Sequence, residues 1–181
     1  MATLHSTTPQ TREDRAIYHA IKLLEKRLRS PGDVLSSSQR VADYLCLLLA
    51  SEEREVFMAL WLDAQNGLIE ADAMFYGTLN QTSVYPREVV KRGLQLNAAS
   101  VIFAHNHPSG RAAPSHHDLV LTCALQETLA LVDLRVFDHF IVAGTVAYSL
   151  AEHGLLGLRD FPEDAPTPKQ RRTIKKTAKK N

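Results

Sequence analysis

The sequence has little cysteine and no long apolar run. Only Cys46 and Cys123 are present among 181 residues, and neither belongs to a CxxC pair. This excludes a cysteine zinc cage and a disulfide framework, because both need several suitably spaced cysteines. No stretch approaches the roughly 20 apolar residues of a transmembrane helix, and the polar start MATLHSTTPQTREDR lacks the apolar core of a secretory signal. We therefore expect a protein of the reducing cytoplasm without membrane contact.

Charge is balanced over the whole chain but not along it. The formal net charge is +1, from 21 Lys and Arg against 20 Asp and Glu. The segment KQRRTIKKTAKKN, from Lys169 to the end, holds seven of the basic residues and no acid, which leaves 14 basic and 20 acidic residues elsewhere. An acidic body is not typical of a surface that follows nucleic-acid phosphates. Only the tail could contact nucleic acid or another polyanion. A solvated, disordered segment is the simpler interpretation of it, and we infer no DNA binding from the tail.

The remaining sequence predicts a layered α/β domain. Its apolar fraction of 45% and charged fraction of 23% are ordinary for a globular protein. The Asn66-Gly67 pair is typical of a hairpin turn, and Pro86 is suited to the first turn of a helix. A hairpin and at least one helical crossover predict a mixed central sheet flanked by helices. Apolar spacing places helices over 13–29, 38–50 and 115–130, and a further helix begins at Pro86 and contains Val89, Val90 and Leu94. Strands are expected over 55–63, 68–75, 98–105, 134–143 and 145–150.

We expect three segments along the chain. Residues 1–35 would be a flexible start and a leading helix, with residues 1–12 disordered. Residues 36–158 would form the main domain, and 159–181 the basic, disordered tail. The sequence contains no internal repeat.

Metal-ligating residue types gather after the strand expected over 98–105. His105 and His107 are two residues apart, so both imidazoles share one strand face. The turn PSG follows, and Asp118 lies 11 residues beyond His107, in the first turn of the next expected helix. The intervening loop is long enough to bring this carboxylate back to the imidazoles. Two imidazoles and one carboxylate suit Zn²⁺ and leave a fourth position for water, as in a catalytic site.

Each part of this pattern also has a simpler interpretation. An isolated HxH is more often a pair of surface residues, and Ser115-x-x-Asp118 before an apolar run is typical of a helix capping box. The joint pattern HxHPSG-x3-PS-x2-D is harder to obtain from surface polarity and capping alone. Capping does not exclude metal ligation, because a carboxylate has two oxygens.

HNHPSG followed by P-S-x-x-D resembles the JAMM (MPN+) metalloprotease motif, particularly in its bacterial RadC branch. The resemblance implies a cytidine-deaminase-like MPN/JAB fold over 36–158. It extends to REVFMALWLDAQN at 54–66, GTLN at 77–80, YPREVVKRGLQLNAAS at 85–100, DHFIVAG at 138–144 and YSLAEHGLL at 148–156.

The resemblance also implies the roles of five residues. His105, His107 and Asp118 would bind Zn²⁺. Ser115 would stabilise the oxyanion of a tetrahedral intermediate. Glu55 would be the general acid/base, and the activity would be hydrolysis of a peptide or isopeptide bond in a protein or peptide substrate.

Several neighbouring residues compete for these roles. Glu52 and Glu53 remain alternatives for the base, although the register of Glu55 fits the family pattern better. We expect His116 and His117 to be surface residues at the start of a helix. His139 would be either buried in the core or placed behind the metal ligands, and a structural role is the simpler interpretation.

Other functions remain open at this stage. A non-catalytic metal-binding scaffold of the MPN class or a DNA-repair accessory of RadC type would carry the same motif. Zinc nucleobase deaminases need H-x-E and P-C-x-x-C, and this chain lacks the cysteine pair. The contiguous letters HNH do not match HNH nucleases, whose residues are spread over a longer motif. The oligomeric state is not predicted.

Overall fold

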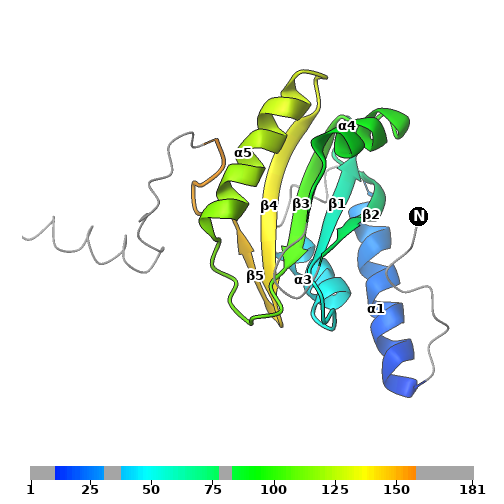
Figure 1. Cartoon of the computed structure of the whole chain (residues 1–181). Coiled ribbons are helices and arrows are strands. Elements are labelled where there is room, and N and C mark those ends of the chain that lie inside the picture. The colour runs from blue at the N-terminus through cyan, green and yellow to red at the C-terminus, as the bar shows by residue number, and fades with distance from the viewer. Residues whose placement is uncertain (1–10, 31–37, 78–82, 158–181) are drawn as a thin grey trace, which may run out of the picture.

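The computed structural model describes residues 11–30, 38–77 and 83–157. The disorder expected for the first residues falls mostly, and that of the tail wholly, outside these ranges. No helix within them is both long and apolar enough to cross a bilayer. Figure 1 shows a sheet covered by helices. The elements are α1 (Arg12–Leu28), α3 (Ser38–Leu49), β1 (Val56–Leu62), β2 (Leu68–Tyr76), α4 (Pro86–Gln95), β3 (Ser100–Asn106), α5 (His116–Ala130), β4 (Arg135–Ala143) and β5 (Val146–Ser149).

The five strands form one mixed sheet in the order β2-β1-β3-β4-β5. β3 and β4 are parallel, and the other neighbouring pairs are antiparallel. α5 connects the two parallel strands, which need such a crossover. The expected α/β class with a mixed central sheet is therefore confirmed.

The hairpin between β1 and β2 turns at the predicted residues. Asn66 has a φ of 63°, which asparagine tolerates better than most residues. The carboxylate of Asp63 accepts hydrogen bonds from the backbone of Gln65 and Gly67, each at 2.8 Å. These bonds satisfy turn donors that have no partner in the strand ladder.

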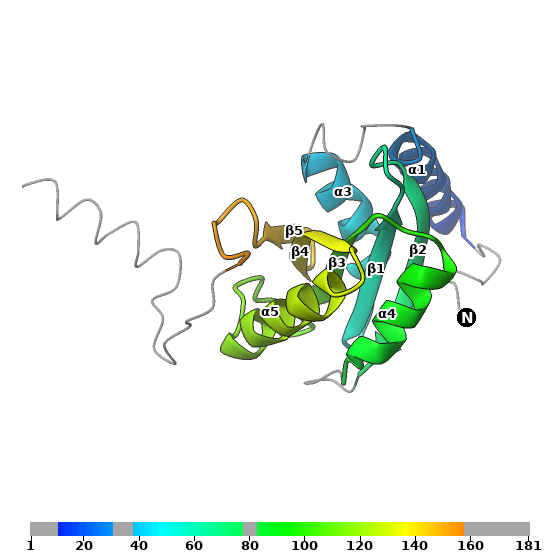
Figure 2. The same cartoon turned by 90° about the horizontal axis from the view of Figure 1, so that it is seen from above.

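The sheet separates two layers of helices. Viewed from above, α1 and α3 lie on one side and α4 and α5 on the other (Figure 2). Every residue of β1 is buried, because its side chains alternate between the two faces. Met58, Leu60 and Leu62 pack toward α1 and α3, whereas Phe57, Ala59 and Trp61 pack toward α4 and α5.

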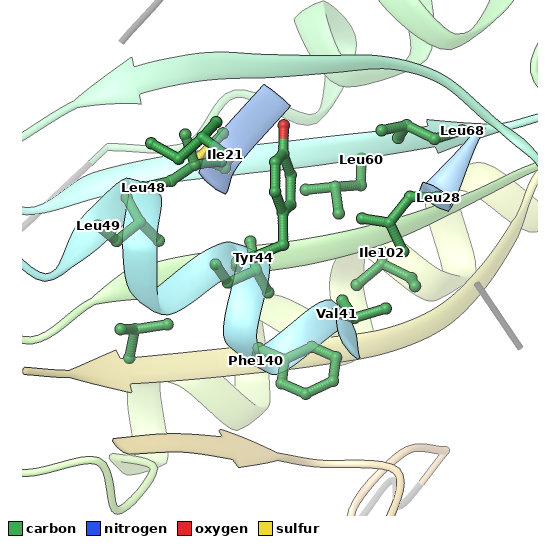
Figure 3. Close-up of a cluster of buried hydrophobic side chains, with 14 of the residues drawn as sticks. Ile21, Leu28, Val41, Tyr44, Leu48, Leu49, Leu60, Leu68, Ile102 and Phe140 are labelled. Carbon is green, nitrogen blue, oxygen red and sulfur yellow. The ribbon is translucent and has the colours of Figure 1, made fainter. Parts of the chain in front are cut away.

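The leading helix α1 belongs to the first of these clusters. Ile21 and Leu28 are buried in the same cluster as Val41 and Tyr44, which project from α3 over the strands (Figure 3). Thr11 caps α1 through reciprocal hydrogen bonds with Asp14, both at 3.0 Å. The helix therefore begins at Arg12, so Thr11 and Arg12 do not belong to a disordered start as expected. The reason is a capping box that the sequence interpretation overlooked.

Helix α4 lies close to the sheet because it contains Gly93. A Cβ atom there would come within 2.3 Å of Leu134 Cδ1 and 3.0 Å of Trp61 Cζ3. Both neighbours are buried, and the indole ring is rigid. Trp61 is also held by a hydrogen bond from its Nε1 to Asp72 Oδ2 at 3.0 Å. The absence of a side chain at Gly93 thus sets the distance between α4 and β1.

We expect Gly93→Ala to lower the free energy of unfolding by about 1–2 kcal/mol. Overpacking a filled core costs roughly 1–3 kcal/mol, which outweighs the roughly 0.5–1 kcal/mol that alanine gains over glycine in a helix. Urea unfolding measures the change. Leu94→Ala, at an exposed position of the same helix, is the control and should change stability by less than about 0.5 kcal/mol. A stabilised Gly93→Ala protein would show that the contact is not tight.

Candidate metal centre

Three side chains converge where β3 ends. Nε2 of His105 lies 2.9 Å from Nε2 of His107. It also lies 3.2 Å from Oδ1 of Asp118, and His107 Nε2 lies 3.5 Å from Oδ2 of the same carboxylate. One ligand atom from each residue lies within 4.8 Å of the other two. The three residues singled out in the sequence therefore form a group that could hold a metal ion.

The two histidines share a face because β3 continues into the loop. His105 points to the α5 side of the sheet, as Val101 and Phe103 do. His107 lies just beyond the strand, but its backbone N–H donates to the carbonyl of Val142 at 2.8 Å. This bond prolongs the pairing with β4 and keeps the second imidazole beside the first.

Asp118 reaches the histidines from the first turn of α5. The backbone N–H and the hydroxyl of Ser115 donate to its Oδ2 at 2.7 and 2.6 Å. In return, the backbone N–H of Asp118 donates to Ser115 Oγ at 3.2 Å. The expected capping box is present, and it orients the same carboxylate toward the imidazoles. Capping and convergence are therefore both satisfied by one side chain.

The pKa values of Asp118 and His107 are both shifted by their surroundings. Burial alone would raise the pKa of Asp118, but hydrogen bonds from His105, His107 and Ser115 hold that pKa far below its ordinary range. Burial lowers the pKa of His107, yet the bonds to Asp118 and to the Arg111 carbonyl outweigh it and raise the pKa. Buried negative charge at Asp118 thus favours a cation between these side chains.

The outer nitrogen of His107 faces an acceptor. Its Nδ1 lies 2.8 Å from the carbonyl oxygen of Arg111. A carbonyl only accepts hydrogen bonds, so Nδ1 carries a proton. Nε2 of the neutral ring then offers its lone pair to the centre of the cluster. In the metal-free protein, a proton must separate the facing acceptors, and a metal ion would displace it.

Two further polar side chains lie behind His105. His139 of β4 is fully buried, and its Nε2 lies 2.8 Å from His105 Nδ1. Its Nδ1 lies 2.6 Å from Oγ1 of Thr122, whose hydroxyl donates to the backbone carbonyl of Asp118 at 2.6 Å. Burial, followed by the charge of His105, lowers the pKa of His139 well below its ordinary value. His139 is buried as expected, and it also contacts a residue of the candidate metal site, the alternative that the sequence left open.

Asn106 points to the opposite face of the sheet from the two histidines. Its Oδ1 accepts from the backbone N–H of Val56 at 2.7 Å. Its Nδ2 donates to the carbonyls of Arg54 at 2.9 Å and Glu52 at 3.2 Å. One buried amide therefore fixes the segment that carries Glu55. The sequence interpretation missed this role, although Asn106 is the middle letter of the HNH string.

Glu55 lies immediately before β1 and is half-buried. Its carbonyl accepts from the backbone N–H of Gly77 at 2.8 Å. It precedes Phe57 by two residues, and Phe57 is paired with His105 across the strands. The charge of Glu55 is among the factors that raise the pKa of His107. The strand pairing and the charge effect place Glu55 near the candidate metal site, on the same side of the sheet as His105.

The competing residues differ from one another in exposure. Glu53 is exposed, and Glu52 is half-buried. His116 and His117 are exposed in the first turn of α5, as expected for surface residues. None of the four belongs to the converging group found among the described residues. Glu52 and Glu53 nevertheless stay as alternatives for the base.

Comparison with known proteins agrees with this geometry. The family model described as "RadC-like JAB domain" matches residues 35–155, which is most of the chain. This chain belongs to the RadC-like JAB domain family. The resemblance inferred from the sequence motifs is thereby confirmed.

Relatives of this RadC-like domain differ in length. UPF0758 protein YkfG of Escherichia coli (strain K12) is 52% identical over 149 residues, which are 82% of this chain and 93% of that protein. UPF0758 protein YfjY of the same strain is 51% identical over 142 residues, 78% and 89% of the two chains. A UPF0758 protein of Dechloromonas aromatica (strain RCB) is 62% identical over 125 residues, but this chain spans only 55% of it. These names state no reaction, so the reaction must be argued from the site.

We expect Asn106→Ala to lower the free energy of unfolding of the metal-free RadC-like domain by about 2–4 kcal/mol. The change removes three hydrogen bonds and leaves the buried N–H of Val56 without an acceptor, each such loss costing roughly 1–3 kcal/mol. Urea unfolding in the presence of a chelator measures the effect. Gln95→Ala deletes an exposed amide and should change stability by less than about 0.5 kcal/mol. Equal stabilities for the two variants would contradict this role for Asn106.

Proposed function

We propose that this chain is a zinc-dependent hydrolase of the JAMM type, which cleaves a peptide or isopeptide amide bond with a metal-activated water molecule. The convergence of two imidazole nitrogens and one carboxylate carries the proposal. Three protein ligands of this kind are typical of catalytic zinc sites, where the fourth position is left for water. The substrate would be a protein or peptide.

The spacing of the donor atoms fits zinc. Ligands at about 2.0–2.1 Å from a tetrahedral zinc ion lie about 3.3 Å from one another. Nε2 of His105 lies 2.9 Å from Nε2 of His107 and 3.2 Å from Oδ1 of Asp118, both close to that value. One ligand atom from each of the three residues lies within 4.8 Å of the others. His105, His107 and Asp118 would hold the ion. Bound zinc supplies Lewis acidity, which activates water near neutral pH and polarises a substrate carbonyl.

Glu55 would move the proton. Its carboxylate would take a proton from the attacking water and later deliver it to the departing nitrogen of the amide. Two observations support this assignment: Glu55 is half-buried near the candidate metal site, and its charge acts on His107. Asn106 fixes the backbone on both sides of it.

Ser115 would stabilise the oxyanion. It is exposed at the N-terminus of α5, beside the Asp118 carboxylate. Its hydroxyl hydrogen now points to Asp118 Oδ2 and would turn toward the substrate oxygen as that oxygen gains negative charge. A single donor of this kind is worth roughly 10²–10³-fold in rate.

Metal content is the first test. Elemental analysis of tag-free protein should find about one zinc per wild-type chain and none in His105→Ala/His107→Ala. The matched control is His116→Ala/His117→Ala, which removes two exposed imidazoles and should keep the zinc. Absence of metal in the wild type after incubation with zinc would overturn the proposal.

Glu55→Gln should keep the zinc and lose hydrolysis. General acid–base catalysis contributes roughly 10²–10⁴-fold, and an amide cannot accept the proton. A library of linear and lysine-branched peptides, analysed by mass spectrometry for new amino termini and released amines, measures cleavage by the zinc-loaded protein. Glu53→Gln, an exposed change in the same segment, should retain activity. Full activity in Glu55→Gln sinks the assignment of the base, and a zinc-loaded wild type that cleaves nothing favours a metal-binding scaffold.

A further inference from the structure

A buried chain of hydrogen bonds runs from α5 to the inner nitrogen of His105. We infer that Thr122 and His139 act as positioning residues, which hold the ring proton of His105 on Nδ1 and so keep Nε2 available for the metal. The inference rests on the metal-binding part of the proposed function and not on hydrolysis.

Thr122 determines which atom donates in each of these hydrogen bonds. Its Oγ1 lies 2.6 Å from the backbone carbonyl of Asp118, one helical turn earlier. The carbonyl only accepts, so the single hydroxyl hydrogen points there. Oγ1 must then accept from its other partner, Nδ1 of His139 at 2.6 Å. His139 therefore carries a proton on Nδ1.

His139 donates a hydrogen bond from one ring nitrogen and accepts one at the other. It is fully buried, and no carboxylate of the described residues is hydrogen-bonded to either of its ring nitrogens. A charged imidazole would be costly there, so the ring is neutral, with one donor and one acceptor. Because Nδ1 donates, Nε2 accepts, and its partner at 2.8 Å is Nδ1 of His105. The ring proton of His105 is thereby held on the side away from the metal cluster.

The reverse direction gives a site that binds metal poorly. If Thr122 donated to His139, its oxygen would face the Asp118 carbonyl at 2.6 Å without a hydrogen between them. His139 Nε2 would then donate to His105 Nδ1. The ring proton of His105 would move to Nε2, the atom that must ligate the ion. A ligating nitrogen has to be unprotonated. Only the first direction therefore leaves Nε2 of His105 free to bind the ion.

These hydrogen bonds, which we call the relay, run from Thr122 through His139 to His105. The relay also explains why these polar groups are tolerated in the interior. Ligating histidines usually donate their second nitrogen to a carboxylate, a carbonyl or water, and losing that partner costs roughly 10–100-fold in metal affinity. Here the acceptor is a neutral imidazole, which itself needs Thr122 to fix its tautomer. Thr122 is 2% exposed and His139 0%, so water cannot replace either partner.

The first experiment compares zinc affinities, measured by competition with a chromophoric chelator. His139→Leu fills the space without an acceptor and should weaken zinc binding by about 10–100-fold. His139→Gln offers an amide oxygen and should recover most of that loss. Thr122→Val removes the hydroxyl at constant shape and should weaken binding several-fold, whereas Thr122→Ser should stay close to wild type.

A matched control lies on the same helix. Thr128 donates to the carbonyl of Ala124 at 2.7 Å with the same geometry, but at a half-buried position outside the relay. Thr128→Val should leave zinc affinity unchanged. Thermal unfolding of the metal-free variants separates packing from positioning. If zinc affinity simply follows the stability of the metal-free protein, with leucine no worse than glutamine at 139, the relay has only a structural role and the inference is wrong.

The second experiment uses only the wild-type protein, so it does not depend on the folding of a variant. Nitrogen-15 NMR of the histidine rings in metal-free wild type should show His139 protonated on Nδ1 and bare on Nε2. Protonated Nε2 on a neutral His139 would overturn the inference, whatever the protein binds. If the predicted tautomer is found but zinc does not bind, the proposed function fails while the direction of the hydrogen bonds stands.

Discussion

The alternation of side chains along β3 is the constraint on which the site depends. Neighbouring residues of a strand face opposite sides of the sheet, so His105 is presented to α5 while Asn106 is presented to the other face. The first arranges the metal cluster, and the second fixes the segment before β1. A shift of β3 by one residue would exchange these faces and destroy both arrangements together. The two flanking strands prevent such a shift, since β3 is paired on both edges.

The buried polar side chains near the site are stabilised because each of them has a hydrogen-bond partner. A buried carboxylate, two buried imidazoles and a buried hydroxyl would each destabilise the core if left unpaired. Asp118, Thr122, His105 and His139 instead form one connected set with hydrogen-bond distances of 2.6–3.2 Å. Such a set stabilises one arrangement of its members, because the loss of any one side chain leaves another buried polar group without a hydrogen-bond partner. The order of the site is therefore a property of the network rather than of any single ligand.

Local chemistry made much of this predictable from sequence. Asn66-Gly67, Pro86 and Ser115 mark a turn and two helix starts, and the elements lie within a few residues of their expected positions. The candidate metal ligands were recognisable because the two histidines lie two residues apart at the end of one strand and Asp118 is in the next element. Thr11 was overlooked because its capping partner is an aspartate in an otherwise polar stretch.

The supporting residues could not be predicted in the same way. The contact between His139 and His105 exists only because β4 pairs in parallel with β3 at the observed register. Thr122 shares a helix face with Asp118, but nothing in the sequence indicates which buried group it meets. Asn106 bonds to a segment about fifty residues earlier. Such long-range partners follow from strand order, which periodicity alone does not fix.

The pairing of β3 on both edges has a consequence for how the protein fluctuates. Backbone amides in a central strand exchange with solvent only when much of the sheet opens, whereas loop amides exchange through small local openings. His105 belongs to the first class, while His107 lies just past the strand and Asp118 on the far side of the loop. A metal ion held by all three residues, as proposed, would therefore join α5 to the central strand across that loop.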